Sequence, residues 1–324
     1  MSSKLINQVQ RELHLMREEM QAGELYESLG LRVGELLDDL GDKDPATPVA
    51  QLDDYEVELI VETGTRLQRG LLSNKLQSVT DEDLATLING LGQTDPEIRE
   101  DMSLNVLLQL IQNQILTTEQ LLTLNAHVFR PEVLYFHLLE QDNDGVFLRS
   151  FNLCLVSIMK LWEHPLPYTK IDYDRMLDLL GTYIALETDT RGFVDQKGNI
   201  RAFLHIGHVL DAFNFDEQLI RLDKIFLLTI LMERYKRLRT PLLMGEEQRI
   251  AAYLVNLMAF DQLYIDYVLS TLKQMRQEMM VLGEPKNEGD WHRINNQHRL
   301  IDALMLNEKT PASITNYLKD LKFF

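Results

Sequence analysis

The spacing of the apolar residues is the feature that most constrains this chain, because it follows the helix period along nearly the whole length. An early example is the series Leu5, Val9, Leu13, Met16 and Met20, which recurs at steps of three and four residues. Alternating runs rich in Val, Ile and Thr are missing, and no Asn-Gly turn lies between two such runs. The sequence therefore predicts an all-α fold.

Helix start signals divide the apolar runs into about a dozen helices. Thr80 and Asp83 have the spacing of a capping box, and Pro131 is placed to be the first residue of a helix. Short connections favour antiparallel neighbours, so the predicted architecture is stacked antiparallel helical hairpins that form a bundle or a superhelical array (solenoid). Residues 94–99 are faintly echoed at 215–221, but the fixed period of a solenoid is missing, so the echo is only weak support for repeated helical hairpins.

Two irregular segments, Gly41 to Pro48 and Leu282 to Asp290, interrupt the helical pattern with proline and glycine. They predict an N-terminal helical pair at 1–41, a main helical array at 49–282 and a C-terminal helical pair at 290–324. The same segments are equally compatible with loops inside one domain.

The charge balance argues against nucleic-acid partners. The 324 residues carry 32 Lys and Arg against 50 Asp and Glu, a formal net charge of −18, which repels nucleic-acid phosphates. No run approaches the roughly 20 apolar residues of a membrane span, and the first residues lack the apolar core of a signal peptide. Cys154 is the only cysteine, which excludes an intramolecular disulfide and indicates the cytoplasm. Its apolar neighbours predict a place in the core.

Basic residues end the segment from Lys224 to Arg239, after an apolar run. Cations are favourable near a helix C-terminus, so this segment is predicted to end in a solvated helix terminus. The alternative is a basic amphipathic helix that binds a membrane or a partner.

Ionisable side chains of three kinds gather between Asp189 and Asp211. At ~100° per residue, Arg201, His205 and His208 fall on one stripe of a helix, and Asp211 lies at its edge. One interpretation is the polar face of an amphipathic helix. The other is a groove in which His205, His208 and Asp211 are catalytic candidates, since histidine titrates near neutral pH.

A metal site is disfavoured by the spacing of these residues. A zinc ion needs a third protein ligand besides His205 and His208, and Asp211, Asp189 or Asp195 is only near in sequence. The His-Glu-x-x-His arrangement of a metalloprotease is also missing. We expect no metal and no cofactor, with His205, His208 and Asp211 as the remaining candidate ligands.

Arginines near this stretch are candidates for binding an anionic ligand. Arg201 beside two histidines is suited to hold a carboxylate or phosphate, because a guanidinium presents a planar fork of donors. Asp189, Arg191 and Arg149 are further candidate ligand-binding residues. We expect Arg149 to pair with a carboxylate such as Asp189 in a structural role.

The segment Asp142-Asn143-Asp144-Gly145 superficially resembles a calcium loop, but Phe151 stands where an EF-hand requires Glu. It is better explained as a turn and a helix start. Phe147, Phe151 and Leu155 are then predicted to point into the core.

Three blocks together carry a resemblance to a known family. They are Asp95 to Asp101, Gly145 to Phe151, and Asp189 to Val194, the last followed by Lys197-Gly198. In combination they resemble an uncharacterised bacterial family of unknown function, the family numbered 2785. The resemblance implies a helical, HEAT-like fold over about residues 80 to 215 and implies no activity.

The third block departs from the family pattern. There the block continues as Gly-Trp-x-His with a second His four residues on, whereas this chain has Asn199 at the Trp and Arg201 at the first His. His205 keeps the second His, and His208 stands where the pattern has Asp unless Asp211 replaces it. The departure weakens a paired-histidine site.

No complete catalytic constellation accompanies the helical pattern. We therefore expect a non-enzymatic interaction protein that binds a protein or peptide along a groove containing Arg201, His205 and His208. The alternative is an enzyme or small-ligand receptor with His205 as acid or base, Arg201 as anion clamp and Asp211 or Asp189 as the orienting carboxylate.

Overall fold

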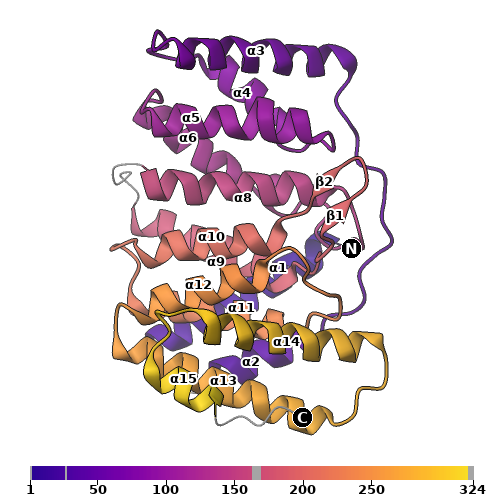
Figure 1. Ribbon diagram of the computed structural model, residues 1–324, viewed down its shortest axis with the longest axis vertical. Helices are drawn as coiled ribbons and strands as arrows, with labels where there is room; N and C mark the ends of the chain where they lie inside the picture. The colour runs from indigo at the N-terminus through magenta and orange to yellow at the C-terminus, as the bar shows by residue number, and fades with distance from the viewer. Residues whose placement is uncertain (1, 26–27, 163–168, 320–324) are drawn as a thin grey trace. The chain divides into compact units, whose positions relative to one another are not determined.

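Helices dominate the computed structural model, which describes residues 2–25, 28–162 and 169–319 (Figure 1). This confirms the all-α prediction. The exception in the described part is a hairpin of two short strands, β1 (Phe193–Val194) and β2 (Gly198–Asn199), which pair antiparallel. None of the described helices combines the length and the apolar content needed to cross a membrane.

Contacts between residues divide the chain into two compact units. Unit 1 comprises Met1–Asp42, Leu180–Thr190 and Phe213–Phe324, and unit 2 comprises Lys43–Leu179 and Arg191–Ala212. The first crossing between the units falls in the irregular segment predicted at residues 41–48. The domain ranges 1–41, 49–282 and 290–324 stay predictions, and residues 320–324 of the last range lie outside the described part.

Unit 2 contains a succession of helices and the hairpin. In chain order these are α3 (Asp54–Leu72), α4 (Asp81–Gly90), η1 (Glu97–Leu104), α5 (Asn105–Gln112), α6 (Thr118–Val128), α7 (Pro131–Leu134), α8 (Gly145–Trp162), most of α9 (Lys170–Leu186), β1, β2 and nearly all of α10 (Ala202–Asn214). Complete capping boxes begin α3, α4 and α6, and that of α4 pairs Thr80 with Asp83 as predicted.

The π-helix η1 packs closely against both α3 and α4. Gly90 permits this approach, because a Cβ added there would lie 1.9 Å from the Ser103 hydroxyl oxygen. On α8, the side chains of Phe147, Phe151 and Leu155 are fully buried, which confirms their predicted place in the core. The close packing of η1 decides where its one arginine, Arg99, points.

Unit 1 is built around helix α11. Its helices are α1 (Ser2–Gln21), α2 (Leu29–Asp38), the end of α9, α11 (Arg221–Lys236), α12 (Glu246–Met258), α13 (Gln262–Leu282), α14 (Glu288–Leu306) and α15 (Ala312–Lys319). Helix α11 contacts α1, α2 and α13, and every residue from 225 to 236 is buried. A helix covered on all sides has no solvated face.

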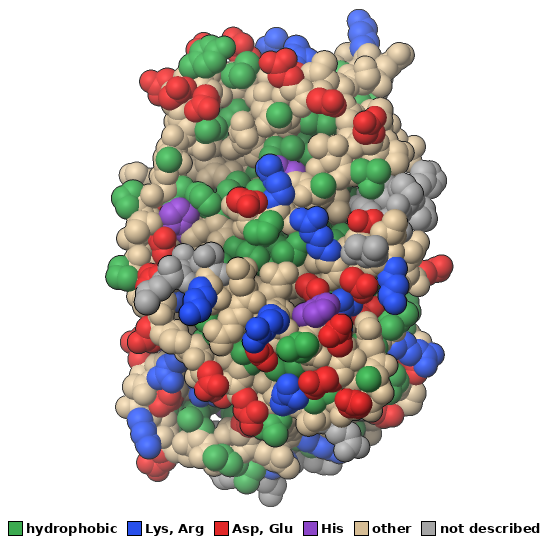
Figure 2. Space-filling model, turned by 180° about the vertical axis from the view of Figure 1, so that it is seen from behind, with side chains coloured by type: hydrophobic (Ala, Val, Ile, Leu, Met, Phe, Trp, Pro, Cys, Tyr) green, Lys and Arg blue, Asp and Glu red, His purple; other side chains and the backbone are tan. Residues whose placement is uncertain are grey.

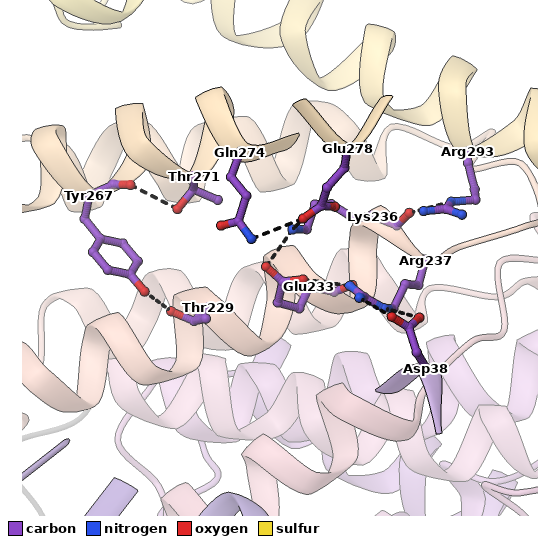
Figure 3. A network of polar contacts seen from close by, with 10 residues as sticks. All are labelled: Asp38, Thr229, Glu233, Lys236, Arg237, Tyr267, Thr271, Gln274, Glu278 and Arg293. Carbon is purple, nitrogen blue, oxygen red and sulfur yellow. Dashed lines mark hydrogen bonds and ion pairs between the residues drawn. The ribbon is translucent and has the colours of Figure 1, made fainter. Parts of the chain in front are cut away.

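The prediction of a solvated terminus at Lys224 to Arg239 is therefore wrong for the end of α11. Lys236 is 0% exposed, and its ammonium lies 2.6 Å from Glu233 and 2.7 Å from Glu278 of α13 (Figure 3). Arg237 joins Glu233 to Asp38 of α2, at 2.7 Å from each carboxylate. Burial raises the pKa of Glu233 and Lys236 opposes the rise, so the basic end of this helix is an internal ion network.

Candidate functional site

Arg99 lies where the three signature blocks meet in unit 2. Its side chain is fully buried and donates to the carbonyl oxygens of Gln93 at 2.8 Å, Thr94 at 3.0 Å and Lys197 at 2.9 Å. A fourth bond, at 2.8 Å, goes to the Glu100 carboxylate. One guanidinium thus ties the first block to Lys197-Gly198, which follows the third block.

The second block supplies the aromatic walls around the same group. The guanidinium carbon of Arg99 lies 4.2 Å from the ring centroid of Phe147 and 4.7 Å from that of Phe151. Stacking of this kind is favourable for a desolvated arginine. Burial lowers the pKa of Arg99 and Glu100 opposes that change, but an arginine keeps its proton in proteins.

Arg201, the predicted anion clamp, faces a carboxylate of its own chain. Its guanidinium lies 3.1 Å from Glu100, the same carboxylate that Arg99 contacts, and its side chain is 35% exposed. Glu100 therefore bridges two arginines. A ligand at Arg201 has to compete with, or add to, this internal pair.

Further contacts hold the β1–β2 hairpin on unit 2. Lys197 pairs with Asp144 at 2.6 Å, and Arg191 donates to the carbonyl of Asn143 at 3.0 Å. Gly198 has φ of +81°, and a Cβ added there would lie 3.1 Å from a terminal nitrogen of Arg99. The hairpin is thus seated directly on the buried arginine.

His205, the central member of the predicted stripe, is 2% exposed. Its Nδ1 lies 2.7 Å from the Ser150 carbonyl, which can only accept, so we assign the proton to Nδ1. The ring meets Phe151 edge-on at 5.2 Å and stacks with His208 at 6.0 Å between centroids. Burial is the main cause that lowers the pKa of His205, to about 3, and the charge of His208 adds to this effect. His205 is neutral at physiological pH.

The other predicted residues are distributed between the units. His208 and Asp211 are partly exposed on α10, and no three metal-ligating side chains gather anywhere in the described ranges. Asp189 is buried in unit 1. Arg149 is buried in unit 2 and donates to the Phe136 carbonyl at 2.6 Å. Its pairing with Asp189, and the ligand-binding role of these residues, stay predictions.

Cys154 is buried on α8, as its apolar neighbours predict. Burial raises the pKa of its thiol to about 12. The thiolate required for nucleophilic attack is therefore scarcely populated at neutral pH.

Sequence reasoning passed over Arg99 and Glu100 as site residues, although both belong to a signature block. Local composition gives little warning, because charged residues make up most of Glu97 to Asp101, as at the start of an ordinary surface helix. The signal that could have found Arg99 and Glu100 is their place in the first signature block, whose resemblance to the family no local structural feature explains.

The pH dependence of stability offers a test of the His205 environment. The unfolded chain takes up a proton at His205 below about pH 6.5, whereas the folded state resists until about pH 3, so stability falls as the pH is lowered through this window. Between pH 7 and pH 5, the wild type should lose about 2 kcal/mol more than His205→Asn, which keeps a donor for Ser150.

Urea unfolding of both proteins at the two pH values measures this difference. His14→Asn, at a partly exposed position of α1, serves as control and should follow the wild type. Parallel losses in wild type and His205→Asn would show that His205 takes up its proton while folded.

Comparison with known proteins identifies a family but no characterised relative. Searches of curated proteins and of solved structures found no match to the chain. The family described as "Protein of unknown function (DUF2785)" matches residues 134–306, more than half of the 324 residues. The match includes the second and third signature blocks, the hairpin and α10, and the chain belongs to this family.

Proposed function

We propose that this protein is a non-enzymatic helical scaffold of stacked, HEAT-like hairpins that binds a protein or peptide partner. The observation that carries the proposal is that buried contacts from Arg99 hold the β1–β2 hairpin in place while Phe193 on it is 66% exposed to solvent. Aromatic side chains are enriched at protein interfaces. A surface held in its bound shape binds with a smaller entropic cost.

The charged groups around the hairpin support a structural role. Arg99 forms hydrogen bonds with backbone carbonyls and an ion pair with Glu100. Lys197 is paired with Asp144. His205 is buried and neutral. Because His205 is covered, we place the contact surface on the hairpin next to the predicted stripe. The enzyme or small-ligand alternative has less support, since Arg201 already faces a carboxylate.

The single buried cysteine also bears on location. A chain that forms no intramolecular disulfide is suited to a reducing compartment. We accordingly propose the cytoplasm as the site of action.

A photo-crosslinker at position 193 tests the proposal. Phe193 replaced by p-benzoylphenylalanine should capture one discrete protein from extracts of the source cells, whereas the same group at Leu72, which is 84% exposed on α3, should not. With the captured protein purified, Phe193→Ala should weaken binding about tenfold or more. Its free energy of unfolding should stay within about 0.5 kcal/mol of the wild type, because the side chain is exposed.

Two results would contradict this role. One is equal capture from positions 193 and 72, which indicates contact by chance. The other is unchanged affinity of Phe193→Ala for the captured protein.

A further inference from the structure

A cavity of about 270 Å³ lies between α3 and α4 in unit 2, away from the hairpin in sequence. It is lined by Leu59, Glu62, Thr63 and Arg66 of α3 and by Glu82, Asp83 and Thr86 of α4. Pockets for small molecules usually have about 300–1,000 Å³. The size is therefore better suited to one side chain of a partner than to a cofactor.

A hydroxyl on the wall of this cavity has no internal partner. Threonine in a helix commonly donates to the carbonyl four residues earlier, as Thr86 does to Glu82 at 2.9 Å. Thr63 is 6% exposed and lines the cavity, yet its hydroxyl has no hydrogen-bond partner among the described residues. This oxygen is not among the polar atoms closed off from solvent, so it is open to a ligand that donates or accepts a hydrogen bond.

The charges at the cavity decide the sign of that ligand. Arg66 is paired with Asp83, whereas Glu62 and Glu82 have no ion-pair partner among the described residues. Leu59 is 38% exposed beside them. Figure 2 shows carboxylate, basic and hydrophobic side chains together over this end of unit 2, at the top of the view.

We propose that this cavity binds the guanidinium of an arginine side chain in a partner peptide. A guanidinium carries five N–H donors and no acceptor, which suits two carboxylates and a hydroxyl oxygen. Its methylene stem can lie on Leu59, since arginine packs its stem on apolar surface. The site thus takes a peptide with an arginine, and an apolar residue beside that arginine can share the contact with Leu59.

The inference rests on the proposed function in assigning a peptide partner, but it uses a separate surface. Phe193 does not line the cavity. Failure of the crosslink at position 193 leaves the cavity proposal standing, and failure of the cavity test leaves the hairpin proposal standing.

The probe is a fluorescein-labelled helical peptide with arginine and leucine one turn apart, compared with the same peptide carrying neutral citrulline in place of arginine. Fluorescence anisotropy should show saturable binding of the arginine peptide and binding weaker by about tenfold or more for the citrulline peptide. Glu62→Gln/Glu82→Gln should weaken binding of the arginine peptide to a similar extent. Thr63→Val, which removes only the hydroxyl, should weaken it about fivefold.

The net charge of −18 attracts any cationic peptide, so a charge-matched control is essential. Glu119→Gln/Glu132→Gln removes the same charge from exposed positions at the starts of α6 and α7 and should bind like the wild type. Phe193→Ala should also leave the peptide affinity unchanged. The proposal is overturned if the wild type does not bind the arginine peptide, if citrulline makes no difference, or if both double variants lose affinity equally.

Discussion

Arg99→Ala should lower the free energy of unfolding by about 3–5 kcal/mol. The variant leaves the carbonyls of Gln93 and Lys197 without their buried donor and opens a cavity beside the rings of Phe147 and Phe151. Each unsatisfied buried acceptor costs about 1–3 kcal/mol, and the lost packing adds to this. Urea unfolding gives the change in stability.

Hydrogen exchange locates the effect within unit 2. The amide of Ile200 donates to the Gly192 carbonyl at 2.8 Å, across the hairpin that Arg99 supports. Exchange of this amide should become much faster in Arg99→Ala, because the hairpin loses the hydrogen bond from Arg99 to the Lys197 carbonyl. Equal exchange in both proteins would show that the hairpin is held by its other contacts.

Arg66→Ala is the matched control for Arg99→Ala. Arg66 also pairs with a carboxylate, that of Asp83, but its side chain is 57% exposed. Exposed ion pairs contribute about 0–1 kcal/mol, so this variant should remain near wild-type stability. Similar losses in the two variants would refute the assignment of Arg99 as a buried support of the β1–β2 hairpin.

The difference between these two arginines shows what the sequence could predict. Helices and caps depend on residues a few positions apart, so the period of the apolar residues and the pair Thr80 and Asp83 were sufficient to find them. The core positions Phe147, Phe151 and Leu155 followed from the same period. These features could be predicted because each depends on residues that are close together in the sequence.

Burial of a polar side chain depends instead on what packs over it. His205 and Lys236 both belong to sequence segments with polar faces, but distant residues cover them: Ser150 of α8 accepts from His205, and Glu278 of α13 receives Lys236. No spacing within α10 or α11 encodes those partners. The hairpin escaped prediction for a related reason, since strands of two residues have no period.

Lys236→Met should also destabilise the fold strongly, by about 3–5 kcal/mol, with its effect in unit 1. The ammonium of Lys236 is fully buried between Glu233, itself 2% exposed, and Glu278 (Figure 3). Methionine fills a similar volume, so the main loss is the charge that compensates Glu233. Urea unfolding at neutral pH measures the deficit.

The matched control for this variant is Lys273→Met on α13. Lys273 is exposed, with its ammonium 5.9 Å from the ring centroid of Tyr317. This change should cost no more than about 0.5 kcal/mol. A double variant, Lys236→Met/Glu233→Gln, should be more stable than Lys236→Met alone, because it no longer buries a carboxylate that has lost one of its two cationic partners.

The deficit of Lys236→Met should depend on pH. Burial already raises the pKa of Glu233 in the folded protein, with Lys236 and Arg237 opposing the rise and Glu278 adding to it. Removing Lys236 raises that pKa further. A carboxyl with a raised folded pKa contributes its full stability below its unfolded pKa and loses it as the pH rises through the folded pKa.

The difference between Lys236→Met and wild type should therefore be largest near about pH 8 and shrink towards about pH 5, where Glu233 takes up a proton in the variant. The double variant with Glu233→Gln should lose this pH dependence, because it has no carboxyl at that position to protonate. A deficit that stays constant across the range would show that Glu233 keeps its charge without Lys236, and that Arg237, 2.7 Å away, is sufficient to hold it.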